Sequence, residues 1–363
     1  MNFNNMNINS ELVSVLNNIG INSPTEIQKK AIPDIINGKN LIAKSNTGTG
    51  KTLSFLIPIL NNLVSKNKQT SLILVPTREL AIQVFNEAER IIQKLDIKND
   101  GINILALYGG RDIQSQINKL KKDIDIIVAT PGRLLDHLNR KTINLTKIDI
   151  LVIDEVDQML LMGFMGEIDR VIKNIKNTPQ LLCFSATVDS KVKKLAYRYS
   201  DNIQIIGIDD NHTLADLIEQ EFIFTTDRDK FDDLCKIIDR DNPFMAIIFC
   251  RTKARVDNLD LKLSQKKYNC AKIHSDISQS KRERIIKDFR NLKTQFLIST
   301  DLSSRGLDIE GITHIYNYDL PDRLEDYIHR VGRTGRIGKD GKACSFVTDK
   351  NTDLYELIQK KLL

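Results

Sequence analysis

Short runs of apolar and β-branched residues alternate along the chain with longer stretches of helical periodicity. In the first half the predicted strands are Leu41–Ala43, Leu72–Val75, Ile104–Leu107, Ile126–Ala129, Ile150–Ile153 and Leu181–Phe184. In the second half they are Glu221–Thr225, Ala246–Cys250, Ala271–His274, Phe296–Ser299, His314–Tyr318 and Ala343–Val347. Strands that are hydrophobic along nearly their whole length, and that are separated by helices, are typical of parallel sheets covered on both faces. The sequence therefore predicts an α/β protein.

The chain of 363 residues is longer than one ordinary domain, so two domains are expected. A polar, acidic stretch from about Gly207 to Asp216 separates the two sets of strands and has no hydrophobic period, as a linker would. The predicted organisation is a first domain over residues 1–207, a linker over 208–216 and a second domain over 217–363. The absence of a short sequence period excludes a solenoid.

The composition suits a globular protein, with 41% hydrophobic and 28% charged residues. The net charge of +6 favours a polyanionic partner without requiring one. The five cysteines are scattered and form no CxxC pair, so we expect reduced thiols in the core. No apolar run is long enough for a membrane span, and the Asn-rich amino terminus does not resemble a signal peptide. These features predict a cytoplasmic protein.

A glycine-rich segment follows the first predicted strand and precedes an apolar helical stretch. It consists of Ser45, Asn46, Thr47, Gly48, Thr49, Gly50, Lys51 and Thr52. A loop of this kind between a strand and a helix surrounds phosphate oxygens with backbone N–H groups, and the helix start adds partial positive charge. We predict that Lys51 contacts the β- and γ-phosphates and that the Thr52 hydroxyl contacts Mg²⁺. Ser45 stands where the strict pattern has glycine; a purely structural turn is the alternative.

An acidic box, Asp154-Glu155-Val156-Asp157, follows the strand Ile150–Ile153. Carboxylates at the end of a buried strand are costly unless they meet a metal or another partner. We predict that Asp154 holds Mg²⁺, directly or through water, and that Glu155 activates or positions the attacking water. A solvated acidic turn is the alternative, and the phosphate-binding loop argues against it.

Further segments occur in a fixed order along the chain. They are Phe3, Gly20–Gln28, Pro76–Ala81, Gly109-Gly110, Thr130–Arg133, Ser185–Thr187, Ile247–Thr252, Gln279–Arg282, Ser299–Asp301, Arg305–Asp308 and Tyr327–Arg336. Together with the loop and the acidic box, they resemble the DEAD-box RNA helicases over essentially the whole chain. The resemblance implies two tandem RecA-like domains, each a mostly parallel sheet with helices on both faces, and ATP and Mg²⁺ as cofactors.

For the nucleotide, the resemblance implies that Gln28 recognises the adenine edge and that Asp308 holds the ribose. It also implies that Arg330 and Arg333 extend from the second domain to the γ-phosphate, so that the site is complete only after the domains close. Thr25 and Gln28 also have the spacing of a capping box, and the two roles of Gln28 can coexist.

For RNA, the resemblance implies backbone contacts by amides, hydroxyls and arginines, which suit phosphates and 2′-OH groups rather than base sequence. On the first domain these are Thr77, Arg78, Gly109, Gly110, Thr130, Gly132 and Arg133; on the second they are Arg251, Arg282 and Thr300. The residues implied to couple the nucleotide site to RNA are Asp157, Ser185, Thr187 and His329.

The sequence departs from the family at three further positions. Val156 replaces alanine in the acidic box, Ile21 replaces an aromatic residue that stacks on adenine, and Ser275 replaces glycine. We expect Ile21 to weaken ATP binding and Val156 to have little effect on the chemistry. The expected catalytic residues are all present, which argues against an inactive ATPase.

The predicted function is RNA-stimulated ATP hydrolysis coupled to local, non-processive unwinding or remodelling of RNA duplexes and ribonucleoproteins. We expect a monomer that binds RNA and ATP and does not bind membranes. Its choice of RNA would be determined by its core or by protein cofactors. A DEAH-type helicase would have histidine in place of Asp157. An ATP-dependent RNA clamp would share every residue named above, so that alternative stays open. The sequence does not identify the RNA target.

Overall fold

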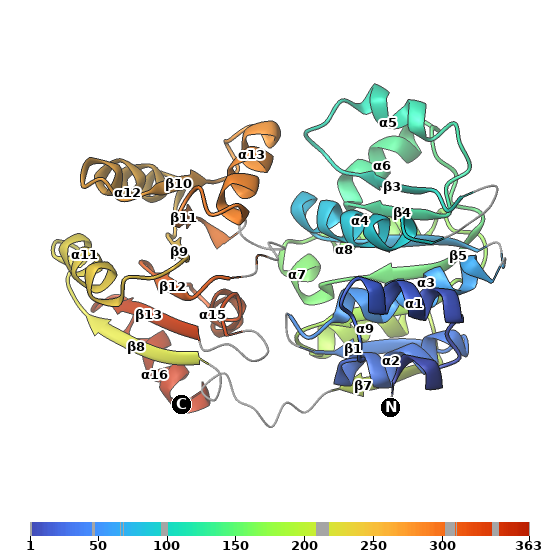
Figure 1. The fold of residues 1–363 in the computed structure, drawn as a ribbon, viewed down its shortest axis with the longest axis horizontal. Helices are drawn as coiled ribbons and strands as arrows, with labels where there is room; N and C mark the ends of the chain where they lie inside the picture. Colours follow the sequence, from blue (N-terminus) through green and yellow to red (C-terminus); the bar gives the residue numbers. More distant parts are fainter. Residues whose placement is uncertain are drawn as a thin grey trace. The chain divides into compact units, whose positions relative to one another are not determined.

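The computed structural model describes residues 2–45, 48–65, 67, 69–95, 101–207, 218–301, 309, 311–335 and 341–362. The chain forms two compact units, Met1–Asp209 and Asp210–Leu363 (Figure 1). Each unit is built around its own sheet and has a hydrophobic core on each face of that sheet. The predicted linker, residues 208–216, lies outside the described residues.

The first unit contains a seven-stranded sheet with the order β3-β4-β2-β5-β6-β1-β7. Its strands are β1 Asn40–Lys44, β2 Thr70–Leu74, β3 Ile104–Leu107, β4 Ile126–Ala129, β5 Ile148–Ile153, β6 Gln180–Ser185 and β7 Ile203–Gly207. All of their pairings are parallel. The carboxyl ends of these strands therefore share one edge of the sheet.

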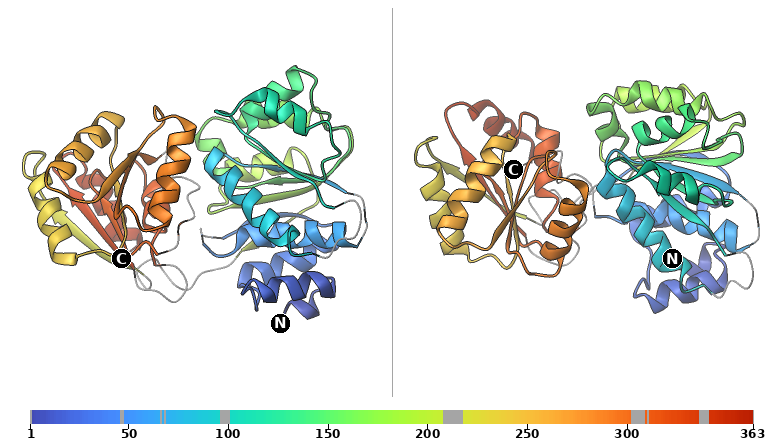
Figure 2. Two further views of the ribbon diagram at one scale, coloured as in Figure 1. Left: turned by 45° about the horizontal axis from the view of Figure 1, so that its top comes forward. Right: turned by 90° about the horizontal axis from the view of Figure 1, so that it is seen from above.

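Helices cover both faces of this sheet (Figures 1 and 2). They are η1 Phe3–Asn5, α1 Ser10–Asn18, α2 Glu26–Ile36, α3 Lys51–Val64, α4 Arg78–Ile92, α5 Ile113–Lys119, α6 Pro131–Asn139, α7 Val156–Leu161, α8 Met165–Ile172 and α9 Ser190–Tyr197. One core contains α1 to α4 and the Ile73 side of β2, and the other contains α6 to α9 and the Leu72 side. Successive strand residues enter opposite cores, which explains why the strands are apolar throughout.

The second unit contains a six-stranded sheet with the order β10-β11-β9-β12-β13-β8, and its pairings are also parallel. Its strands are β8 Ile218–Phe224, β9 Ala246–Phe249, β10 Cys270–Ile273, β11 Phe296–Ser299, β12 His314–Asn317 and β13 Gly341–Val347. Its helices are α11 Lys230–Asp241, α12 Lys253–Gln265, α13 Gln279–Arg290, α15 Leu324–Val331 and α16 Thr352–Leu362. Helices α11 and α12 pack on one face, and α13, α15 and α16 pack on the other.

The predicted α/β class, with parallel sheets covered on both faces, is confirmed, and every predicted strand overlaps an observed one. Strand β7 was missed. It lies at the edge of the sheet, pairs with β1 on one side, and buries Ile206 while Ile205 is 44% exposed. An edge strand with so little buried surface lacks the continuous hydrophobic run that identifies the central strands.

Among the described residues, no helix combines the length and the apolar character needed to cross a bilayer.

Candidate functional site

The carboxyl edge of the first sheet contains two neighbouring groups of predicted site residues. The phosphate-binding loop follows β1, the acidic box follows β5, and Ser185 ends β6, the strand between them. The predicted RNA-binding segments follow β2, β3 and β4, which form the adjacent part of the same sheet. Ligands of open α/β sheets bind at this edge, so the strand order separates a nucleotide half from an RNA half.

The phosphate-binding loop leads into α3 through two glycines in the left-handed region, Gly48 at φ 82° and Gly50 at φ 93°. Glycine adopts this conformation without the steric cost that a side chain would add. Lys51 begins α3 and is only 8% exposed, and its Nζ has no hydrogen-bond partner among the described residues. A buried ammonium group without a partner, at a helix N-terminus, fits a phosphate ligand.

Ser45, the departure from the strict loop pattern, has a side-chain contact that glycine could not make. Its hydroxyl hydrogen-bonds to the hydroxyl of Thr49, and its backbone N–H donates to the carbonyl of Ser185 at 3.0 Å. Ser45 is 2% exposed. The hydroxyl therefore links the start of the loop to Thr49, and the backbone N–H, which glycine would also have, links it to the end of β6.

Gln28 is 2% exposed and links α2 to the phosphate-binding loop. Its Oε1 accepts a hydrogen bond from the backbone N–H of Thr25 at 3.0 Å, which is the glutamine half of a capping box. Its Nε2 donates to the carbonyl of Gly50 at 3.0 Å. A Cβ on Gly50 would lie 2.4 Å from this Nε2, so the amide can pack here only against glycine.

Asp154 lies at the end of β5 and is 3% exposed. Burial raises the pKa of its carboxyl to about 7, although the positive charge of Lys51 acts in the opposite direction. Its Oδ1 accepts a hydrogen bond from the backbone N–H of Glu155 at 2.9 Å. A divalent cation would favour the ionised carboxylate over the protonated form, so the environment of Asp154 fits a Mg²⁺ ligand.

Glu155 adopts the left-handed region, at φ 50°, where residues other than glycine are uncommon. The residue is 9% exposed and directly precedes α7. Strain of this kind persists only where surrounding structure enforces it, and it is frequent at functional sites.

Asp157 connects the acidic box to the segment after β6. Its backbone N–H donates to Ser185 Oγ at 3.3 Å. Its Oδ2 accepts from the backbone N–H groups of Ala186 and Thr187, at 3.1 and 3.0 Å, and from the Thr187 hydroxyl at 3.2 Å. The structure thus brings together three of the predicted coupling residues. Ser185 also binds the start of the phosphate-binding loop. A shift of that loop would therefore displace the segment after β6, and a shift of that segment would displace the loop.

The predicted RNA segments of the first unit also lie close together. Thr77 caps α4, its Oγ1 accepting from the backbone N–H of Leu80 at 3.2 Å. The Arg78 guanidinium lies against Gly109, where an added Cβ would be 3.3 Å from Nη2. Gly110 has a φ of 85°, which favours glycine.

The segment after β4 contributes a second arginine to this region. The backbone N–H of Thr130 donates to the carbonyl of Leu107 at the end of β3, at 3.0 Å. Gly132 lies in the first turn of α6 with open space where a side chain would stand. Burial lowers the pKa of Arg133, and the nearby charge of Arg78 acts in the same direction.

Sequence patterns missed residues that shape this region. Arg111 follows the two glycines; its carbonyl accepts from Arg133 Nη1 at 3.1 Å and its guanidinium lies 5.8 Å from the centre of the Tyr108 ring. Behind it, Gln116 Nε2 donates to the Tyr108 carbonyl at 3.1 Å, and Gln116 Oε1 lies 3.0 Å from Nε2 of the buried His137. Arg111 could have been suspected from its place after the glycines, but nothing local indicates the pairing of residues 116 and 137.

In the second unit, the predicted RNA-binding residues follow neighbouring strands. Arg251 follows β9 and pairs with Asp322, with 2.9 Å between Nη2 and Oδ1. Thr300 follows β11, and Arg282 lies in the first turn of α13 and is 7% exposed. Of the remaining predicted residues, His329 is in α15 and Arg333 lies just beyond its C-cap, Gly332, and both are buried.

Arg330 has many contacts within the second unit and is 2% exposed. Its guanidinium forms a two-pronged ion pair with Asp301, with 2.7 Å between Nη2 and Oδ2. Nη1 donates to Asn317 Oδ1 at 3.2 Å and to the carbonyl of Asp319, and the group stacks 4.9 Å from the Phe249 ring centre. In this conformation Arg330 holds the ends of β9, β11 and β12 together.

Three predicted nucleotide-binding residues, Asn46, Thr47 and Asp308, lie outside the described residues.

The three further residues that differ from the family pattern lie at a buried, a partly buried and an exposed position. Val156 is fully buried in a core, which explains why an aliphatic residue suits it. Ile21 is partly buried against the other core of the first unit, and Phe3, the first segment of the resemblance, is 1% exposed in that core. Ser275, which follows β10, is exposed.

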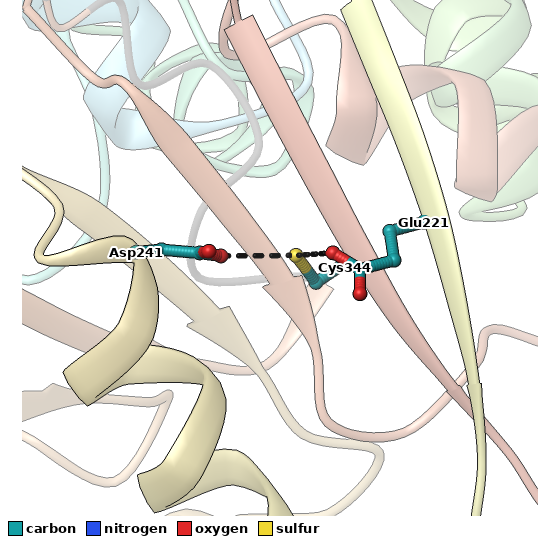
Figure 3. Close-up of side chains that lie close together, drawn as sticks. All are labelled: Glu221, Asp241 and Cys344. Atoms are coloured by element: carbon teal, nitrogen blue, oxygen red, sulfur yellow. Dashed lines mark hydrogen bonds between the residues drawn. The ribbon is translucent and has the colours of Figure 1, made fainter.

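One cluster outside the predicted site has the composition of a metal centre, namely Glu221, Asp241 and Cys344 (Figure 3). Both carboxylates already have cationic partners: Arg240 Nη1 lies 2.8 Å from Glu221 Oε1, and Lys342 Nζ lies 3.0 Å from Glu221 and 3.3 Å from Asp241. Burial raises the pKa of the Cys344 thiol, which opposes the thiolate that a metal needs. We therefore assign this cluster a structural role.

Comparison with known proteins agrees with this geometry. The profile of the DEAD/DEAH box helicase family matches residues 25–195, and that of the helicase conserved C-terminal domain matches residues 229–338. The ATP-dependent RNA helicase CshA of Listeria monocytogenes is 40% identical over 359 residues, or 99% of this chain and 68% of that protein. The CshA of Bacillus subtilis is 40% identical over 360 residues, covering 99% and 72%.

Solved structures agree as well. Dbp5 of S. cerevisiae bound to RNA and ADP BeF3 aligns with a TM-score of 0.87 and 31% identity, over 99% of this chain and 93% of that one. The chain belongs to the DEAD-box family of ATP-dependent RNA helicases. The predicted family, the tandem RecA-like fold and the enzyme class, an ATP-hydrolysing RNA helicase, are confirmed.

Proposed function

We propose that this helicase couples RNA-stimulated ATP hydrolysis to local, non-processive unwinding of RNA duplexes. The observation that carries the proposal is the shared carboxyl edge of the first sheet, where the nucleotide half and the RNA half are neighbours. The Asp157–Ser185–Thr187 network lies at β5 and β6, within the nucleotide half. Through it, a change around the phosphates would alter the segment after β6.

In this proposal the first unit binds ATP through its phosphates. The Lys51 ammonium group offsets phosphate charge, and the left-handed glycines let backbone N–H groups face the oxygens. Thr52 and Asp154 would hold Mg²⁺, which when bound neutralises charge that develops on the phosphates. Glu155, held in its strained conformation beside Asp154, would position the attacking water.

Arginines of the second unit would then complete the site. We assign the γ-phosphate contact to Arg333 and Arg330, and the Arg330 guanidinium is bound by Asp301, Asn317 and Asp319. Arg330 would have to exchange some of these partners before it could contact the γ-phosphate. Hydrolysis would therefore depend on the second unit, and RNA bound to both units would stimulate it.

RNA would be held by its backbone, through amides, hydroxyls and the cluster of Arg78, Arg111 and Arg133. Such contacts distinguish RNA from DNA by the 2′-OH group and follow one strand without recognising its sequence. The solved structure of Dbp5 bound to RNA and ADP BeF3 supports binding of RNA and nucleotide by this fold. Monomeric action in the cytoplasm, with protein cofactors that select the RNA, stays a prediction.

Strand separation across a series of duplex lengths tests the proposal. We expect short RNA duplexes to open and long ones to stay paired, RNA but not DNA to stimulate ATP hydrolysis, and affinity to fall with salt. Protein with Lys51→Ala controls for passive strand capture. Efficient opening of long duplexes, or equal stimulation by DNA, would overturn the proposal. RNA-stimulated hydrolysis without separation of short duplexes would instead identify a clamp.

Gln28 gives a separate prediction about nucleotide choice. A glutamine amide can form four hydrogen bonds, and among the described residues one acceptor site and one N–H of Gln28 are used. The remaining N–H and lone pair match what N7 and N6 of adenine require. In Gln28→Ala we expect binding of both ATP and GTP to weaken, because the loop loses its anchor. ATP should lose about tenfold more affinity than GTP, because it also loses the adenine contact.

Gln180→Ala is the matched control for Gln28→Ala, because the Gln180 amide donates to the carbonyl of Ile35 at 2.9 Å and anchors the other end of α2. Nucleotide affinities should be unchanged in this variant. If ATP and GTP weaken equally in Gln28→Ala, the residue only holds the loop and adenine is recognised elsewhere.

A further inference from the structure

Asp319 lies beyond the end of β12, in the interior of the second unit, and is 5% exposed. Its backbone N–H donates to the carbonyl of Phe249 at 3.0 Å, which extends the pairing of β12 with β9 by a further step. The motifs discussed above do not include Asp319.

The side-chain carboxylate and the backbone carbonyl of Asp319 contact two different predicted site segments. Its carboxylate Oδ2 accepts a hydrogen bond from the backbone N–H of Arg251, a predicted RNA-binding residue, at 2.9 Å. Its backbone carbonyl accepts from Nη1 of Arg330, a predicted γ-phosphate residue. A single residue therefore connects the RNA side and the nucleotide side of this unit.

A buried lysine fixes the Asp319 carboxylate. Lys230, at the start of α11, is 2% exposed, and its Nζ lies 3.2 Å from Asp319 Oδ1 and 5.2 Å from the centre of the Tyr318 ring. Burial lowers the pKa of Lys230, and the charge of Asp319 opposes that shift. Arg255 also contacts Oδ1, with Nη1 at 3.3 Å, but it is partly exposed.

A buried ion pair of this kind contributes little net free energy to folding. Removing two charges from water offsets most of their attraction, and apolar residues of similar size are often as stable. A buried pair does, however, restrict the carboxylate to one orientation, and here that carboxylate accepts from the Arg251 backbone N–H. The backbone of the same residue, paired with Phe249 through its N–H, presents the carbonyl that accepts from Arg330.

We infer that Lys230 and Asp319 are positioning residues that make RNA binding at Arg251 and phosphate contact at Arg330 depend on each other. The inference rests on the proposed function of those two arginines. It gives the second unit a coupling element comparable to the Asp157–Ser185–Thr187 network of the first. Neither positioning residue needs to touch RNA or ATP.

Lys230→Met removes the buried cation and keeps an unbranched side chain of similar length. We expect the RNA concentration for half-maximal ATPase stimulation to rise and the RNA-stimulated kcat to fall, each by about five- to tenfold, within the usual range of coupling between sites. Affinity of the free protein for ATP should stay unchanged, because the phosphate-binding loop belongs to the first unit. Asp319→Asn should shift the same two quantities, and the double variant should add little.

Lys342→Met is the matched control. Lys342 is also a largely buried lysine of the second unit, but its ion pairs are with Glu219, Glu221 and Asp241, none of which is a predicted site residue. We expect it to lower the unfolding temperature without changing either RNA-dependent quantity. All measurements are made well below the unfolding temperature of each variant.

The outcomes separate the inference from the proposed function. Wild-type protein whose ATPase does not respond to RNA would overturn the proposed function itself. A wild-type response with Lys230→Met and Asp319→Asn indistinguishable from Lys342→Met would overturn the coupling role and leave an ordinary structural ion pair. If Lys230→Met fails to fold, Asp319→Asn decides the question, because it retains an oxygen that can accept from the Arg251 N–H.

Discussion

Lys51→Ala is expected to abolish ATP hydrolysis while the first unit stays folded. The Nζ atom is buried and, among the described residues, has no hydrogen-bond partner to lose. Folding of the wild-type protein moves this cation out of water, which costs free energy. The alanine variant does not have this cost, so its unfolding temperature should stay the same or rise. Activity should nevertheless fall by at least about 10²–10³-fold, the usual effect of losing one group that stabilises transition-state charge.

The measurement is steady-state hydrolysis at saturating RNA, with thermal unfolding recorded on the same preparation. Lys44→Ala is the matched control, because Lys44 ends β1 just before the loop but is exposed to solvent. That variant should hydrolyse ATP normally. Near-normal turnover with alanine at position 51 would show that this loop does not bind the reacting phosphates.

The central strands could be predicted because burial on both faces leaves a local mark in the sequence. Strands such as β4, Ile126–Ala129, consist of apolar residues alone and were predicted with their observed bounds. Strand β7 could not be found in this way, since Ile205 is exposed at the edge of the sheet. A continuous apolar run marks a strand that is buried on both faces, and an edge strand has little buried surface.

The contacts between site residues are harder to predict from the sequence than the membership of residues in the site. Parallel strands end at one edge, so residues that follow strands could be assigned to a site without knowing the strand order. Which of them touch depends on that order, and on partners far apart in sequence. Gln28 with Gly50, Arg330 with Asp301, and Lys230 with Asp319 have no local signature. Family resemblance supplied roles for some of these residues but not the contacts that hold them.

The two arginines after β12 show why those contacts matter. Both were predicted to meet the γ-phosphate, yet the structure gives Arg330 an ion pair with Asp301 and hydrogen bonds to Asn317 and Asp319. Breaking such a buried arrangement typically costs about 3–5 kcal/mol, because it leaves an uncompensated charge inside the protein. Loss of activity in Arg330→Ala would therefore combine catalytic and structural effects, so thermal unfolding has to be measured beside the rate for either arginine.

Arg333→Ala is expected to leave ATP binding by the first unit nearly unchanged and to reduce RNA-stimulated turnover by about 10³–10⁵-fold, as for arginine fingers in related phosphoryl transfers. The reason is that, in the proposed mechanism, this arginine acts on the γ-phosphate only in the complex with RNA and ATP. The measurements are kcat at saturating RNA, affinity for a non-hydrolysable ATP analogue without RNA, and thermal unfolding. Arg333→Lys, which keeps the charge but not the planar fork, should recover only part of the rate. A loss below about tenfold would mean that another group, with Arg330 the first candidate, stabilises the transferred phosphate.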